Sequence, residues 1–258
     1  MEWRVSKNPL GMLEVVMDKG EVITAEPGAL VYMQGDVDVK TSTKIKEQGL
    51  LSRVKSTILG GESFFLNDYI ANGRCMLGFA GPMIGDIEGI NIDGSYIVQS
   101  RAYVASTGDI SLDTKFQGMV KGIFGTELFM LKVYGRGMLF VNAYGSLFRK
   151  ELKEGERMVI DNYHLVAMNE QQGYNVVKIG KLKTFLLGGE GLGIEVKGPA
   201  TLYLQSKNML ELKAELTRLL DLEKYMQKGS QFNIGIGPGG GREDKDTQEG
   251  WRWGIPRI

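Results

Sequence analysis

Cysteine, histidine and long apolar runs are almost missing from this sequence of 258 residues. The single cysteine, Cys75, excludes an internal disulfide and with it the disulfide-stapled class of small secreted proteins. The single histidine, His164, excludes a metal site made from several histidines. No stretch approaches the roughly 18 apolar residues of a membrane-spanning helix, and Met1 to Arg4 lack the apolar core of a signal peptide. We therefore expect a cytoplasmic protein without a transmembrane span, and peripheral membrane association stays open.

Neither sign of charge is in excess, because 31 lysines and arginines balance 31 aspartates and glutamates. The net field offers no general attraction for nucleic acid, so we expect no DNA partner. Lys178, Lys181 and Lys183 form the densest basic cluster. A solvated strand or loop face is the simpler explanation of that cluster, and a local patch for RNA stays open.

Glycine is abundant, with 36 residues, and this amount is typical of turns in an all-β protein. A short block with glycine and glutamate occurs three times. The blocks are Gly61-Glu62-Ser63-Phe64-Phe65, Gly125-Thr126-Glu127-Leu128-Phe129 and Gly189-Glu190-Gly191-Leu192. Their glutamates lie 65 residues apart (62 to 127) and then 63 residues apart (127 to 190). This spacing indicates one folding unit used three times.

Other segments recur at matching places around each block. Upstream, a glycine at 20, 94 or 155 precedes two apolar stretches. Downstream, pairs of apolar stretches are centred on Gly81-Pro82, Gly135-Arg136-Gly137 and Gly198-Pro199. Because glycine supplies positive φ and proline presets φ, we predict hairpin turns at these three centres.

The repeats predict three β units, at residues 1–92, 93–153 and 154–206. Units of this size are near the lower limit for an independent core, so we expect them to share cores or sheet edges. From 207 to 229 the apolar period changes to 3.6, which predicts one amphipathic helix with Asn208 as its N-cap, packed on the β body. Residues 230–258 are a glycine-rich tail, and the role of its Trp251 and Trp253 stays open.

Four residues are candidates for a functional site: Glu62, Glu127, Glu190 and His164. The glutamates could accept hydrogen bonds from backbone N–H groups where units meet, or they could form a ring of carboxylates for a cation or for acid–base chemistry. Repetition favours the structural role. We expect His164, inside a predicted strand, to be a partly buried or interface residue. We expect no catalytic residue, no metal and no cofactor.

Several longer stretches carry a family pattern. They are Ala25-Glu26-Pro27-Gly28-Ala29-Leu30-Val31-Tyr32-Met33, Ser100-Arg101-Ala102-Tyr103-Val104-Ala105, Val159-Ile160-Asp161-Asn162-Tyr163-His164-Leu165-Val166-Ala167 and Gly188-Gly189-Glu190-Gly191-Leu192, together with the Gly-Glu blocks and glycine centres above. Over about residues 25–206 the sequence resembles the altered-inheritance-of-mitochondria (mitochondrial biogenesis) family, whose prokaryotic members have no assigned function. Thr126 stands where glycine is usual, and the tail is not part of the pattern.

The resemblance implies a fold like that of the trp RNA-binding attenuation protein (TRAP), whose units join edge to edge into rings. We therefore expect an all-β fold: three tandem TRAP-like double-stranded β-helix or β-sandwich repeats, one C-terminal helix and a Gly/Trp-rich tail. Three units in each chain imply a homotrimer with a ring of nine units.

The leading functional hypothesis is a non-enzymatic, ring-forming scaffold or interaction protein. One alternative is a module that binds RNA or a small ligand at the repeat interfaces, and fold analogy alone supports the RNA version. The third hypothesis is an enzyme that uses the repeated glutamates or His164. The sequence identifies no ligand, partner or pathway.

Overall fold

The structure, a computed structural model, describes residues 1–7, 10–42, 58–59, 62–63, 65–113, 130–170, 173–179 and 192–220. The chain divides into two compact units, Met1–Ala214 and Glu215–Ile258. All of the strands belong to the first unit, and every named strand pair is antiparallel. The predicted class, all-β with one C-terminal helix, is confirmed. The finer boundaries at 92, 153 and 206 stay predictions.

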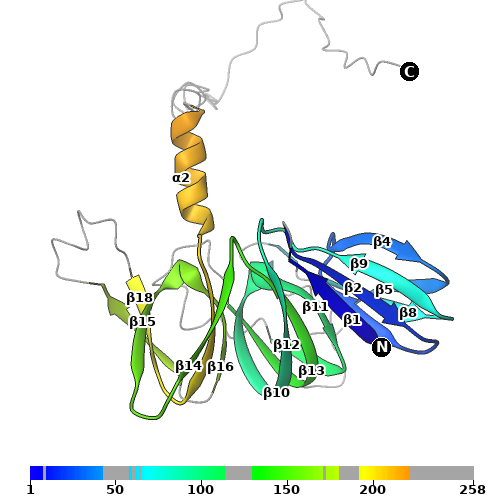
Figure 1. The fold of residues 1–258 in the computed structure, drawn as a ribbon, viewed down its shortest axis with the longest axis horizontal. Coiled ribbons are helices and arrows are strands. Elements are labelled where there is room, and N and C mark those ends of the chain that lie inside the picture. Colours follow the sequence, from blue (N-terminus) through cyan, green and yellow to red (C-terminus); the bar gives the residue numbers. More distant parts are fainter. Residues whose placement is uncertain are drawn as a thin grey trace, which may run out of the picture. The chain divides into compact units, whose positions relative to one another are not determined.

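The strands follow one another in three segments, which are coloured in chain order in Figure 1. The first segment contains β1 (Glu2–Ser6), β2 (Met12–Met17), β3 (Val22–Ala25), β4 (Leu30–Gln34), β5 (Val37–Ser42), β6 (Ile58–Leu59), β7 (Glu62–Ser63), β8 (Leu66–Ala71) and β9 (Cys75–Phe79). The second contains β10 (Ile87–Gln99), the 3-10 turn η1 (Ser100–Ala102), β11 (Tyr103–Thr107), β12 (Asp109–Asp113) and β13 (Met130–Asn142). The third contains β14 (Leu147–Leu152), β15 (Arg157–Asp161), the 3-10 turn η3 (Asn162–His164), β16 (Leu165–Asn169), β17 (Tyr174–Lys178), β18 (Leu192–Lys197) and β19 (Ala200–Gln205), and the helix α2 (Met209–Leu219) follows it.

The same strand pairs occur in each segment. In the first, β8 lies between β3 and β5, and β9 lies between β2 and β4. In the third, β18 lies between β15 and β17, and β19 lies between β14 and β16. In the second, the long strands β10 and β13 serve both groups, with β12 beside one half of β13 and β11 beside the other. Each segment therefore consists of two small sheets that face a common interior.

The predicted hairpins at the glycine centres are wrong. β13 continues unbroken through Gly135 and Gly137, β18 and β19 pair with other strands rather than with each other, and Gly81-Pro82 lies after the end of β9. These centres are corners or ends, and at the corners the chain passes from one sheet to the other. In the second segment Gly94 of β10 pairs with Gly135 of β13 at the corner, and both have positive φ, 126° and 130°. A corner within a strand and a hairpin turn both require glycine, so the sequence pattern alone cannot distinguish the two structures.

Apolar side chains from these sheets form three buried cores. In β2, for example, Leu13, Val15 and Met17 alternate inward between partly exposed neighbours, the period expected for a half-buried strand. The single cysteine, Cys75, is 4% exposed in the first core.

The helix α2 begins where the capping pattern predicts. Asn208 Oδ1 accepts a hydrogen bond from the backbone N–H of Glu211 at 2.8 Å, the contact expected of an N-cap. No residue of α2 is buried. The predicted continuation of the helix to 229, and the tail with Trp251 and Trp253, lie outside the described residues. Within the described part of the chain, the structure contains no helix with the length and apolar character needed to cross a bilayer.

The corner glycines give a test of this architecture. A Cβ at Gly135 would lie 1.9 Å from the backbone oxygen of Asp109, whereas a Cβ at Gly94, at nearly the same φ, would meet nothing within 4 Å. We expect Gly94→Ala to cost about 1–2 kcal/mol of unfolding free energy, from the positive φ alone. Gly135→Ala should cost at least about 3 kcal/mol, because backbone must also move. Urea unfolding of the two variants measures the difference, and equal losses would contradict the corner geometry.

Candidate functional site

His164 is the last residue of η3, and not part of a strand as predicted, because the chain turns there before β16 begins. Its side chain is partly buried, as expected. His164 Nδ1 lies 2.7 Å from the backbone oxygen of Gln205, and Nε2 lies 3.3 Å from Nδ2 of Asn208. Since Asn208 Oδ1 accepts from Glu211, the Asn208 amide presents its NH2 group to His164. Nε2 is therefore the acceptor and Nδ1 donates to Gln205, which makes His164 a link between β19 and the start of α2.

Two buried amide side chains, which were not among the predicted site residues, bind backbone groups from the ends of strands. Asn142, at the end of β13, accepts from the N–H of Met83 at 2.7 Å and donates to the backbone oxygen of Asp86 at 3.1 Å. Gln205, at the end of β19, accepts from the N–H of Tyr144 at 2.9 Å and donates to the backbone oxygen of Tyr163 at 2.8 Å. The only sequence signal was an amide residue at the end of an apolar strand pattern. Both residues hold loops between segments, which is a structural role.

The repeated glutamates are not brought together by any described contact. Glu62 begins β7, but nothing is described of its side chain. Glu127 and Glu190 lie outside the described residues. Among the described residues, no group of three or more His, Cys, Asp or Glu side chains could hold a metal ion.

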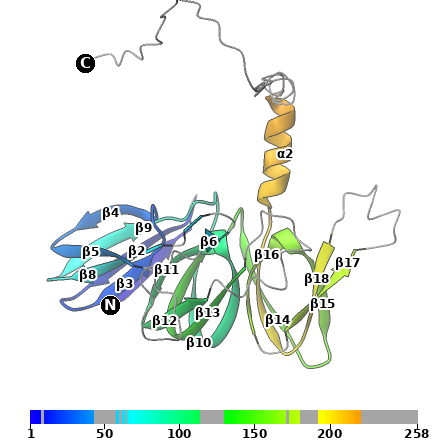
Figure 2. The same ribbon diagram turned by 180° about the vertical axis from the view of Figure 1, so that it is seen from behind.

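Two strand junctions connect the three segments. β3 pairs with β11 through Ala25–Ala105, Thr24–Ser106 and Ile23–Thr107, and β10 pairs with β16 through Val98–Ala167, Ile97–Met168 and Tyr96–Asn169. Figure 2 shows β3 beside β11 from behind. At both junctions, the strand that precedes the turn in one segment meets the strand that follows the turn in the next segment.

The two junctions also share one register. Tyr32, Ala105 and Ala167 are the residues directly after a β-bulge in their segments. Seven residues before each of them lie Ala25, Val98 and Ile160 (25 to 32, 98 to 105 and 160 to 167). We call Ala25, Val98 and Ile160 the earlier markers of the three segments, and Tyr32, Ala105 and Ala167 the later markers. Ala25 faces Ala105 and Val98 faces Ala167, so each junction pairs the earlier marker of one segment with the later marker of the next. Ile160 and Tyr32 are the two markers that face no neighbouring segment among the described residues.

Residues at equivalent positions are buried at the internal junctions and exposed at the two outer edges. Thr24 and Ile97 are 5% and 1% exposed, whereas Val159 of β15, at the equivalent position, is 50% exposed. Likewise Ser106 and Met168 are 5% and 1% exposed, whereas the equivalent Met33 of β4 is 44% exposed. β15 pairs only with β18, and β4 pairs only with β9, within the described residues. The chain therefore presents both halves of a junction without a partner on either.

Polar groups support each internal junction. At the first, Tyr103 Oη donates to the backbone oxygen of Thr24 at 3.2 Å, and the N–H of Glu26 donates to the backbone oxygen of Val104 at 2.9 Å. At the second, Glu170 accepts from Ser95 Oγ at 2.8 Å and pairs with Lys132 Nζ at 2.6 Å. These contacts fix the register, while the apolar side chains contribute most of the stability.

Burial raises the pKa of the Glu26 carboxyl to about 7, and the nearby Arg101 guanidinium opposes the shift. The folded protein thus holds this proton more tightly than the unfolded chain does. The stability that Glu26 contributes is full below about pH 4.5 and is lost as the pH rises through about 7.

The fold defines the class, an all-β protein with one C-terminal helix, and the comparisons place the chain in a family. The mitochondrial biogenesis AIM24 family matches residues 3–207, and the chain belongs to this family. It is similar to an uncharacterized protein of Streptococcus pyogenes serotype M6, with 26% identity over 215 residues that cover 81% of this chain and 86% of the other. A crystal structure of a Streptococcus pyogenes protein from a structural genomics consortium has the same fold, with a TM-score of 0.68, 24% identity, and coverage of 84% of this chain and 99% of that one.

The link through His164 can be tested by truncation. Alanine stands at the equivalent positions, as the buried Ala29 and Ala102, so His164→Ala is sterically acceptable. The variant removes the partners of the Gln205 carbonyl and of the Asn208 NH2 group. We expect a loss of about 1–3 kcal/mol in unfolding free energy, measured by urea titration. A variant as stable as the parent would contradict the structural role of His164.

The pKa shift of Glu26 predicts a stability change that depends on pH. Glu26→Gln should be as stable as the parent near pH 4 and more stable at pH 8, by up to about 3 kcal/mol. Thermal unfolding across this range measures the difference. Glu154→Gln, on an exposed turn, controls for the loss of one negative charge. A stability gain in Glu26→Gln that does not vary with pH would show that Glu26 titrates normally.

Proposed function

We propose that the chain is a non-enzymatic scaffold protein that joins to copies of itself head to tail and closes into a ring. In this proposal three chains supply nine TRAP-like units. The observation that carries it is the recurrence of one strand junction, in one register, between the segments of a single chain. The chain makes this contact twice between its own segments, and its two outer edges carry the two unpaired halves of the same contact. A second copy of the chain could therefore pair with either edge in the same way.

The two outer edges are different surfaces, so contact between chains would be heterologous. Such contacts close into a ring if the rotation returns to its start, and otherwise extend into a filament. An uncovered edge strand also offers unpaired backbone groups to any other strand, a liability that closure removes. Both considerations favour a closed assembly.

The known contacts of the one histidine support a non-enzymatic role. His164 uses both ring nitrogens in contacts with Gln205 and Asn208, which leaves neither one directed at a substrate. The buried, unpaired Cys75 suits a reducing compartment, which supports the cytoplasm as the place of action.

Native mass spectrometry of the full-length protein tests the proposal, with a trimer as the expected mass. Val159→Lys should dissociate the trimer, because it places a charge on an edge that must be covered. Val39→Lys is the matched control, because Val39 on β5 is 47% exposed and lies on an edge that neither junction uses. A monomeric parent protein would overturn the scaffold. RNA binding by a monomer, seen as salt-sensitive retention on a filter, would favour the binding-module hypothesis instead.

A further inference from the structure

We infer that β15 of one copy pairs antiparallel with β4 of the next copy, in the register that places Val159 opposite Met33. This inference rests on the proposed self-assembly and names the surface, the partner strand and the register. It follows from four features of the described strands, and each feature is independent of the resemblance to TRAP.

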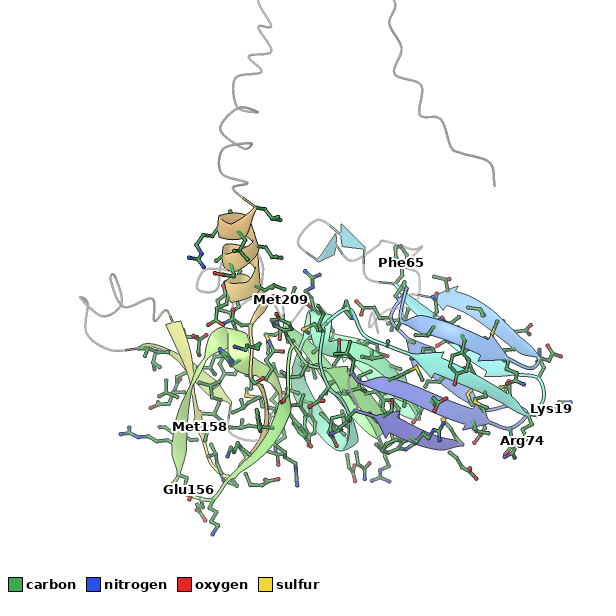
Figure 3. All side chains as sticks on the ribbon, turned by 45° about the horizontal axis from the view of Figure 1, so that its top comes forward. Lys19, Phe65, Arg74, Glu156, Met158 and Met209 are labelled. Atoms are coloured by element: carbon green, nitrogen blue, oxygen red, sulfur yellow. The ribbon has the colours of Figure 1, made fainter. Side chains whose placement is uncertain are left out.

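The first feature is the marker spacing. Both internal junctions place one marker opposite the other, Ala25 opposite Ala105 and Val98 opposite Ala167. Applied to the free markers, the same rule places Ile160 opposite Tyr32. Antiparallel pairing then sets Val159 opposite Met33, and Met158 opposite Gln34. Figure 3 labels Met158 on β15.

The second feature is the sheet count. The two internal junctions join their sheets into one 10-stranded sheet, and β1-β2-β9-β4 and β15-β18-β17 remain separate. These two sheets end in β4 and in β15, the strands that carry the free markers. Pairing β4 with β15 of another copy would unite them, in the order β1-β2-β9-β4-β15-β18-β17. The separate sheets are therefore the two halves of one more junction.

The third feature is the composition of the cores. The first core contains Val104, Ala105 and Phe140 from the second segment, and the second core contains Val166, Ala167 and Tyr203 from the third segment. The third core has no following segment in the chain. The residues equivalent to the valine and alanine are Val31, which is 56% exposed, and Tyr32, which is partly exposed. β4 of a second copy would supply the missing cover.

The fourth feature is a recurring pair of one small and one aromatic residue across the strands. Ala105 pairs with Phe140 and Ala167 pairs with Tyr203, whereas in the first segment Tyr32 pairs with Gly78. The aromatic ring has moved to the other strand, and glycine leaves room for it: a Cβ at Gly78 would lie 2.3 Å from the Tyr32 ring. At each internal junction, an aromatic ring packs against the core of the preceding segment. Tyr32 provides such a ring at the free edge.

A cysteine cross-link tests the register directly. Met33→Cys and Val159→Cys are introduced together in a Cys75→Ala background, and the full-length protein is oxidised gently. Residues directly opposite in an antiparallel pair have Cβ atoms about 4.5–5.5 Å apart, which is near enough for a disulfide after a small shift. On a non-reducing gel we expect covalent dimers and trimers, each converted to monomer by reductant. Either single cysteine variant should remain monomeric on the gel.

Misplaced cysteines and exchanged charges serve as controls. Val39→Cys with Val159→Cys should give no cross-link, since β5 is not at the junction. Met33→Lys and Val159→Glu should each dissociate the native assembly, and the double variant should restore it through a lysine–glutamate pair. This second measurement decides the matter if the cysteine protein fails to fold.

The outcomes separate the inference from the proposed function. A native oligomer that shows neither the cross-link nor rescue by the double charge variant would overturn the β4–β15 pairing and leave self-assembly in place. A disulfide that forms within one chain, or a Val39 pair that reacts equally well, would also overturn the pairing. A monomeric parent protein would overturn both.

Discussion

Backbone hydrogen bonding at strand edges is the constraint on which this structure depends. Each segment is a pair of small sheets, and a small sheet has two edges whose N–H and C=O groups need partners. The chain meets this need by pairing the strand before the turn in one segment with the strand after the turn in the next, at β3–β11 and at β10–β16. The shared register, the shared cores and the position of the loops all follow from those two pairings.

The shared cores explain why segments of this size fold at all. A unit of about 60 residues buries too little apolar surface to be comfortably stable by itself. Here the first core contains Phe140 and the second contains Tyr203, each from the segment that follows. Neighbouring segments therefore stabilise one another, and among the described residues the outer edges β4 and β15 are the ones left uncovered.

Local features were predictable from the sequence, and features set by distant partners were not. The all-β class, the N-cap at Asn208 and the buried Cys75 depend on composition and on near neighbours. The corner at Gly135 was mistaken for a hairpin, because only the pairing with Gly94 and the approach of Asp109 distinguish the two. The same limit applies to function: Val31 and Val104 occupy equivalent sequence positions, yet one is 56% exposed and the other fully buried. The exposure of such a residue depends on which strand lies beside its own, and the residues near it in the sequence do not determine this.

The exchange of ring and small residue between Tyr32–Gly78 and the internal pairs has a consequence for how these positions can vary. Each segment carries one ring at this place, on β4 in the first segment and on β13 or β19 in the others. The small residue on the paired strand leaves room for that ring, so the two positions of a pair must change together. Rings on both strands of one pair would overfill the space, and two small residues would leave a cavity.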